Sequence, residues 1–186
     1  MANWAASTAI VAGPAELARA GVVLARGRPR AKLLLLGNAA AVTEALPMDV
    51  ALPLYPNSVV RTEGVGACLW LRPDQRLLLL AADAAPHTVA RIRTANASDA
   101  WVLDAGARYV EFAVTGRGAV PVLNAACSLD LREAAFPVDS CAQTRFDQIP
   151  VVIFRSSPER FDVFAERPLA DHLWLWMCRA VNDMRE

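Results

Sequence analysis

Two cysteines, two histidines and a few carboxylates are the residues of this sequence that could do covalent or acid–base chemistry. Cys127 and Cys141 stand in the stretch LNAACSLDLREAAFPVDSCAQTRF, residues 123–146. A thiol or hydroxyl becomes a catalytic nucleophile when a base such as histidine lies within hydrogen-bond reach. The two histidines are His87, in the first turn of a predicted short helix, and His172, beside an aspartate on a predicted final helix. Neither lies in a glycine-rich turn, so we interpret both as surface or packing residues.

Three carboxylates in the same stretch could act as a general acid and base. Asp130, Glu133 and Asp139 are close in sequence, and Arg132 and Arg145 are near them. Acid–base catalysis needs carboxyl groups whose pKa values are moved by burial or by neighbours. The surrounding chain is polar, so we interpret these residues as solvated charges with local ion pairs.

The cysteines also set the expectation for metals. The four are Cys68, Cys127, Cys141 and Cys178, and no two have the Cys-x-x-Cys spacing of a local zinc or redox motif. The sequence therefore predicts no metal ligands in this chain. It predicts free thiols in a reducing cytoplasm, because no secretory signal is evident in the first residues.

A glycine-rich turn, TGRGAV at residues 115–120, follows a predicted strand and opens a predicted helix. It lacks the third glycine and the later acidic residue of the dinucleotide-binding fingerprint. We interpret Gly116 and Gly118 as residues that ease a tight strand-to-helix turn. The sequence thus predicts no catalytic, cofactor-binding or metal-binding residue in this chain.

The elements that position these residues follow from the apolar pattern. Residues 1–30 show no clear periodicity, and we expect a loosely held N-terminal arm or linker, followed by one domain over residues 31–186. Strands are predicted at AKLLLL (31–36), WVLD (101–104) and RYVEFAV (108–114). Hairpins are predicted around RPDQ (72–75) and SSPE (156–159), and helices at APHTVARIR (85–93), from Gly118 to Cys127, and after Pro168.

From about residue 76 to 155 the predicted order is strand, helix, strand, strand, helix, strand. That order is typical of the ferredoxin-like split βαβ arrangement. We therefore expect an α+β fold with a ferredoxin-like core, added strands and a C-terminal helix.

The final helix supplies a candidate interface. Its predicted apolar stripe is Leu169, Leu173, Trp176, Met177 and Ala180. Trp174 and Trp176 are two positions apart, so they do not face the same side of a helix. We expect Trp174 to point away from the core and to anchor an interface with a partner protein.

Composition narrows the class of partner. The 186 residues are 55% hydrophobic, with 19 basic and 19 acidic residues, and no uninterrupted apolar run is long enough to cross a membrane. A chain without net charge is not attracted electrostatically to nucleic acid or to an anionic membrane. Surplus apolar surface favours a protein partner.

Several segments, taken in order, resemble a known family. They are LPLYPNSV, CLWLRPDQRLLLL, DAGARYVEFAVTGRGAVPVLNAACSLDLREAAF, CAQTRFDQIPVVIFR and FDVFAERPLADHLWLWM. This set looks like the gamma subunit of heterotetrameric sarcosine oxidase over residues 31 to 180. That subunit is itself similar to the folate-binding domain of the glycine-cleavage aminomethyltransferases.

The resemblance implies a non-catalytic structural subunit that assembles with alpha, beta and delta subunits. Such a complex demethylates sarcosine oxidatively to glycine, formaldehyde or methylene-tetrahydrofolate, and hydrogen peroxide. It uses FAD, FMN, NAD, tetrahydrofolate and zinc on the other subunits. The stretch at 123–146 is then a helix exit and a positioned loop, with Leu129 and Leu131 turned inward, Asp130 outward and Cys141 packed.

Three alternatives remain open from the sequence. One is the gamma subunit of a related N-methyl amino-acid oxidase or dehydrogenase. Another is a free-standing folate-binding protein of the aminomethyltransferase-like fold, although DSCAQTRF lacks most of the motif of the iron–sulfur maintenance proteins of that fold. The third is an enzyme with an unrecognised site.

Overall fold

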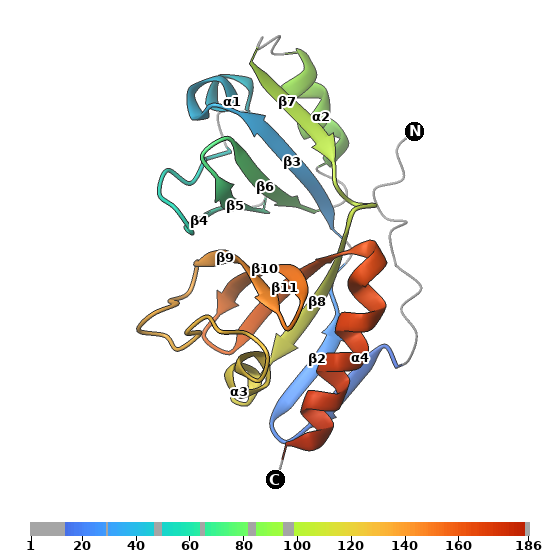
Figure 1. The fold of residues 1–186 in the computed structure, drawn as a ribbon. Coiled ribbons are helices and arrows are strands. Elements are labelled where there is room, and N and C mark those ends of the chain that lie inside the picture. The colour runs from blue at the N-terminus through green and yellow to red at the C-terminus, as the bar shows by residue number, and fades with distance from the viewer. Residues whose placement is uncertain are drawn as a thin grey trace. The chain divides into compact units, whose positions relative to one another are not determined.

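The protein folds into two compact units, each built on one antiparallel sheet (Figure 1). The computed structural model describes residues 14–28, 30–46, 50–63, 66–81, 85–94 and 99–184. Unit 1 takes its described residues from between 30 and 107, and unit 2 takes them from between 14 and 28 and between 108 and 184. The α+β class and the C-terminal helix are as predicted.

Unit 1 is a five-stranded sheet with two helices, and its strand order is β4-β5-β6-β3-β7. The elements are β3 (Ala31–Gly37), α1 (Ala39–Ala45), β4 (Val59–Thr62), β5 (Gly66–Arg72), β6 (Gln75–Leu80), α2 (Ala85–Thr94) and β7 (Ala100–Asp104). The leucine run of β3 lies between β6 and β7 and is antiparallel to both. The β6–α2–β7 connection is therefore a split βαβ unit, with β3 between its two parallel strands.

Strand β7 forms one edge of this sheet. Trp101 and Leu103 point to the same face of β7 and are 57% and 50% exposed. The sheet's opposite face is apolar and packs against the helices, in a core of residues that includes Leu33, Leu35 and Val42. The edge strand is thus the most exposed apolar part of the described sheet.

Unit 2 is a six-stranded sheet with two helices, and its strand order is β1-β2-β8-β11-β10-β9. The elements are β1 (Glu16–Arg19), β2 (Val22–Arg26), β8 (Tyr109–Thr115), α3 (Ala119–Asn124), β9 (Cys141–Phe146), β10 (Ile149–Ser157), β11 (Arg160–Glu166) and α4 (Arg167–Asp183). Helix α4 runs along β2 and β8 (Figure 1). The core under α3 and α4 contains Phe112, Phe161 and Leu123, all fully buried.

Both predicted hairpins are confirmed. Strands β5 and β6 are joined by the two-residue turn Pro73–Asp74, and strands β10 and β11 by a turn at Pro158–Glu159. Turn residues between two apolar runs are a strong local signal, because the pairing that they specify is immediate in sequence.

The predicted ferredoxin-like core over residues 76–155 divides between the two sheets. Strands β6 and β7 lie in unit 1, whereas β8 and β10 lie in unit 2. The break falls at Asp104–Ala107, where the Gly106 amide donates to Oδ1 of Asp104 at 2.8 Å and the Ala105 amide donates to the Lys32 carbonyl at 2.7 Å. Local order predicted the elements correctly, while long-range pairing determined the sheet to which each belongs.

The expected arm of residues 1–30 differs from the structure over residues 14–28. Strands β1 and β2 form a hairpin, and β2 pairs with β8. Val22 and Leu24 alternate inward and are buried, and the turn between the strands uses Ala20 and Gly21 at positive φ. Residues 1–13 lie outside the described residues. The ARAGVVLAR segment therefore belongs to the sheet of unit 2.

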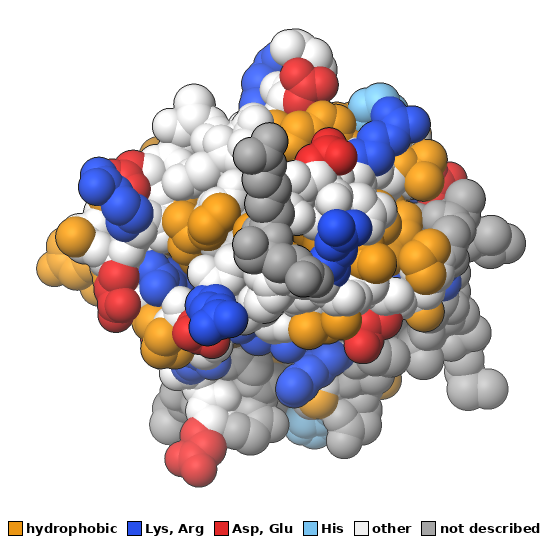
Figure 2. All heavy atoms as spheres, turned by 90° about the horizontal axis from the view of Figure 1, so that it is seen from below, with side chains coloured by type: hydrophobic (Ala, Val, Ile, Leu, Met, Phe, Trp, Pro, Cys, Tyr) orange, Lys and Arg blue, Asp and Glu red, His pale blue; other side chains and the backbone are white. Residues whose placement is uncertain are grey.

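No helix within the described ranges is long and apolar enough to cross a membrane. Acidic and basic side chains are interspersed on the face of the molecule seen from below (Figure 2). That mixture is what 19 basic and 19 acidic residues would give when neither sign is clustered.

Candidate functional site

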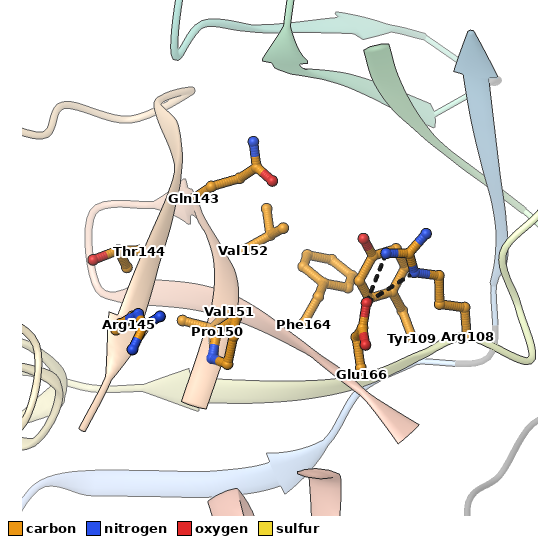
Figure 3. A pocket seen from close by; sticks show the side chains of 10 residues that line it. All are labelled: Arg108, Tyr109, Gln143, Thr144, Arg145, Pro150, Val151, Val152, Phe164 and Glu166. Atoms are coloured by element: carbon orange, nitrogen blue, oxygen red, sulfur yellow. Dashed lines mark hydrogen bonds and ion pairs between the residues drawn. The ribbon is translucent and has the colours of Figure 1, made fainter. Parts of the chain in front are cut away.

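One face of the unit 2 sheet carries a pocket of about 350 Å³ (Figure 3). Strand register explains why its side chains meet. Gln143, Val152 and Phe164 are direct cross-strand neighbours on β9, β10 and β11, so their side chains point to the same face. Tyr109 on β8 lies opposite Glu166 on β11 in the next row. The lining residues are Arg108, Tyr109, Gln143, Thr144, Arg145, Pro150, Val151, Val152, Phe164 and Glu166.

An ion pair closes one side of this pocket. Arg108 donates to Oε1 of Glu166 from Nη2 at 2.6 Å and from Nε at 3.1 Å. The Arg108 guanidinium also lies 5.2 Å from the centre of the Tyr109 ring. The hydrogen bond to Glu166 raises the pKa of Arg108 above its ordinary value, so this cation is permanent.

Tyr109 supplies the pocket's hydroxyl group. Its side chain is buried, and burial raises its pKa above the ordinary value for tyrosine, so the phenol is neutral at neutral pH. A neutral phenol donates or accepts a hydrogen bond but does not act as a base. Phe164 and Val152 are buried beside it and give the pocket an apolar floor. The ten lining residues include neither histidine nor cysteine. The arrangement is suited to binding rather than to covalent catalysis.

A buried arginine organises the loop of residues 128–140, the second place where the sequence suggested chemistry. Arg155 on β10 is 4% exposed. Its Nη1 donates to the carbonyl of Phe136 at 2.9 Å and to that of Leu131 at 3.4 Å, and its Nη2 donates to the carbonyl of Pro158 at 2.6 Å. The Arg155 backbone adds two hydrogen bonds to the same loop, from Asp139 N and to Ser140 O. The side chain and the backbone of Arg155 therefore together fasten this loop to β10.

The interior of this loop is as expected for a positioned segment. Leu131 and Cys141 are fully buried, and Leu129 packs partly against the core. Cys141 begins β9, although the sequence pattern predicted only a loop there. Cys127 is buried, with its Sγ 3.7 Å from Oγ1 of Thr144. Neither cysteine is exposed to a reactant from solution.

The carboxylates of the loop form local ion pairs. Asp130 accepts from Arg132 at 2.6 Å, and this hydrogen bond lowers the pKa of Asp130 to about 2. Oε2 of Glu133 lies 3.7 Å from Nη2 of Arg155, with its own side chain 69% exposed. The predicted local ion pairs are thus present at Asp130 and Glu133.

The remaining candidates are also placed by the fold. His87 and His172 are both exposed on helices. Gly116 has φ +102°, and a Cβ there would stand 2.2 Å from the carbonyl oxygen of Gly21, so this turn needs glycine for close backbone approach. Within the described ranges, no group of three or more His, Cys, Asp or Glu residues could hold a metal ion.

Trp174, the predicted interface residue, is instead a centre of the unit 2 core. It is fully buried and stacks on Phe112 of β8, with 5.4 Å between the ring centroids. The buried stripe of α4 is Ala170, Leu173, Trp174, Met177 and Val181. This stripe and the predicted stripe both have helical spacing. Because Trp174 stacks on Phe112, the side of α4 that carries Trp174 is the one that faces the core. Trp176 lies at the margin of the core, edge-on to Phe146 at 4.7 Å.

Comparison with known proteins gives one family. The model described as "Sarcosine oxidase, gamma subunit family" matches residues 36–183. The sarcosine oxidase subunit gamma of Corynebacterium sp. (strain P-1) is 27% identical over 147 residues, which cover 79% of this chain and 71% of that protein. Its counterpart from strain U-96 is 26% identical over 148 residues, with the same two coverages of 79% and 71%.

Two of the solved structures that share the fold illustrate the likeness. A chain of the heterotetrameric sarcosine oxidase from Corynebacterium sp. U-96, solved in complex with pyrrole 2-carboxylate, superposes with a TM-score of 0.82 at 26% identity. The match covers 92% of this chain and 91% of that chain. The glycine cleavage system aminomethyltransferase T from Bartonella henselae superposes with a TM-score of 0.64 at 19% identity, over 86% of this chain and 46% of that one. The second likeness concerns the fold alone.

Proposed function

Because the chain belongs to the sarcosine oxidase gamma subunit family, we propose that it is the gamma subunit of a heterotetrameric sarcosine oxidase and works as a structural component of that complex. The observation that carries this proposal is the match to a chain of a heterotetrameric sarcosine oxidase over 92% of this chain and 91% of that chain. Because the match covers nearly all of both chains, the two share almost their whole fold.

In this proposal the complex demethylates sarcosine oxidatively in the cytoplasm. Its products are glycine, hydrogen peroxide and a one-carbon unit, which leaves as formaldehyde or as methylene-tetrahydrofolate. FAD, FMN, NAD, tetrahydrofolate and zinc belong to the alpha, beta and delta subunits. The gamma subunit contributes surfaces that hold those subunits together.

The glycine turn between β8 and α3, which lies within the described residues, does not fit a dinucleotide. The glycine turn at 116–118 resembles a phosphate loop in sequence, but the space beside Gly116 is filled by the backbone of the β1–β2 turn. Helix α3 after it has six residues, and no side chain caps its first turn. A pyrophosphate therefore has no cradle at this turn, which supports the placement of FAD and NAD on other subunits.

Co-expression with the open reading frames that neighbour the coding sequence tests the proposal. We expect the tagged chain to copurify with alpha, beta and delta subunits in fixed stoichiometry, and the purified complex to release hydrogen peroxide from sarcosine. The lone chain should be colourless and inactive. A lone chain that binds flavin near equal stoichiometry, or that oxidises sarcosine, would contradict the proposal.

The same preparation separates the alternatives. Faster turnover of another N-methyl amino acid than of sarcosine would indicate a related oxidase or dehydrogenase. Tight folate binding by a lone chain that never associates with the other subunits would indicate a free-standing folate-binding protein.

A further inference from the structure

A short loop of unit 1 exposes two adjacent large apolar side chains. Leu54 and Tyr55, in the segment between α1 and β4, are 71% and 75% exposed. They are the most exposed of the large hydrophobic residues in the described part of the chain. Single exposed apolar residues are common on protein surfaces, but two neighbours at this exposure form a protruding apolar tip.

The backbone that carries this tip is held in place. The Ser58 amide donates to the Tyr55 carbonyl at 3.3 Å, and the Ser58 hydroxyl donates to the same oxygen at 2.7 Å. Pro56 and Asn57, the latter at φ +62°, are the central residues of this β-turn. Proline followed by a residue at positive φ is typical of a type II turn, in which proline fixes the first φ.

A buried arginine fastens the other end of the tip. Arg76 is 4% exposed, and its Nε donates to the carbonyl of Pro53 at 3.4 Å. Its Nη1 donates to the carbonyls of Arg72, Pro73 and Gln75 at 2.6, 3.1 and 3.2 Å. Pro53 is itself buried. Leu54 and Tyr55 are thus presented on a backbone that is tied at both ends to the β5–β6 hairpin and β4.

Charges beside the tip indicate the chemistry of its partner. On the β5–β6 turn, Arg72 and Asp74 make two hydrogen bonds to each other, at 3.0 and 2.9 Å. The two charges satisfy each other, so this ion pair adds no net charge to the hairpin to which the tip is tied. A complementary partner surface is apolar rather than charged.

We propose that Leu54 and Tyr55 form a preorganised anchor that inserts into an apolar socket on a different subunit of the oxidase. This inference rests on the proposed function. A fixed backbone lowers the entropy lost on association, and tyrosine is enriched at the residues that dominate binding energy. The socket takes the Leu54 side chain and the Tyr55 ring, and a polar group at its end pairs with the phenol.

A different subunit fits this anchor better than a second copy does. A copy would have to offer an apolar socket on its own surface, and tip and socket would have to share one surface patch for the contact to close as a two-fold dimer. The match to a chain of a heterotetramer supports a partner of a different sequence.

The test measures binding of the full chain to the remaining subunits of its complex. The double variant Leu54→Ser/Tyr55→Ser should raise the Kd about a hundredfold, which is about 2.8 kcal/mol. Tyr55→Phe should raise it less than tenfold. The matched control is Leu175→Ser, which removes a 45%-exposed leucine from α4 in the other unit and should leave the Kd unchanged. Thermal unfolding of each variant verifies that the fold is retained.

Other outcomes overturn the proposal. An unchanged Kd for the double variant, or an equal loss in Leu175→Ser, shows that this loop is not a specific anchor. A wild-type homodimer that the double variant abolishes assigns the anchor to a second copy. If the wild-type chain fails to bind the other subunits at all, the proposed function fails as well, whereas normal wild-type binding with an unaffected double variant removes only the anchor. A photo-crosslinking residue at position 55 in the complex should attach to a chain of different sequence.

Discussion

Two loops of this protein are held by the same device and present opposite surfaces. In residues 128–140 the guanidinium of Arg155 binds backbone carbonyls, and the apolar side chains of Leu131 and Phe136 turn inward. In residues 51–58 the guanidinium of Arg76 binds the carbonyl of Pro53, but Leu54 and Tyr55 turn outward. A buried arginine fixes the loop in each case, and the direction of the apolar residues separates a loop that stabilises its own unit from one available to another protein.

The largest expected effect separates inward from outward aromatic residues. Phe136→Ala removes a ring that is 4% exposed, so it should lower the free energy of unfolding by about 3–5 kcal/mol. Tyr55→Ala removes a ring that is 75% exposed and should change it by less than about 0.5 kcal/mol. Urea denaturation followed by circular dichroism measures both. Equal losses in the two variants would show that the Tyr55 ring is also part of a core.

The second prediction concerns Arg155, the buried arginine that binds the loop at residues 128–140. Arg155→Met leaves the carbonyls of Phe136 and Leu131 without their donor in a buried site. We expect the free energy of unfolding to fall by about 3 kcal/mol. Arg132→Met is the matched control, because the Arg132 side chain is 78% exposed, and it should have little effect. The role assigned to Arg155 fails if urea denaturation gives the same loss for both variants.

The third prediction concerns Arg76, the buried arginine that binds the loop at residues 51–58. Burial lowers the pKa of Arg76 from its ordinary value, yet the guanidinium stays charged and bound to carbonyls. Three of its four contacts are to partly buried hairpin carbonyls, which water can reach after substitution. Arg76→Met should therefore cost only about 1.5 kcal/mol.

The same variant should also speed amide hydrogen exchange at Ser58, the amide that closes the turn below Tyr55. Arg72→Met, which removes an exposed guanidinium from the same hairpin, is the control. Protection at Ser58 that matches the wild type would mean that Arg76 does not hold this loop.

The smallest effect concerns pH. Arg132 holds the pKa of Asp130 at about 2, below the value of about 3.9 for an unfolded chain. The ionised carboxylate therefore contributes stability above about pH 4, and this contribution is lost as the pH falls toward 2. Asp130→Asn removes the contribution, so acid-unfolding curves of variant and wild type should differ slightly above pH 4 and converge below it. A constant difference down to pH 2 would contradict this cause.

Much of the local structure could be predicted from the sequence. The hairpins at residues 72–75 and 156–159 follow from turn residues between apolar runs, and the final helix follows from its 3.6-residue period. The division into two sheets could not be predicted, because it depends on β2 pairing with β8 and on β3 pairing with β6 and β7. Those partners are far apart in sequence, and no local sequence pattern indicates which strands pair.

The candidate site shows the same limit. Leu131 in the 128–140 loop and Cys141 just after it are apolar or small, so their packing was predictable. Arg155 ends the apolar run PVVIFR and resembles a solvent-facing strand end, and the carbonyls that it binds have no residue signature. Trp174 and Trp176 offered two helical stripes of similar hydrophobicity, and only Phe112, from a distant strand, distinguishes them.

The open edge at β7 has a consequence for how a cell makes this chain. Trp101 and Leu103 flank backbone groups at the rim of the described sheet, and an apolar edge strand is a template for pairing with other copies. Such pairing grows with the square of the concentration of unassembled chain. A cell limits it most simply by translating this chain in step with its partners, so that few orphan copies accumulate at any time.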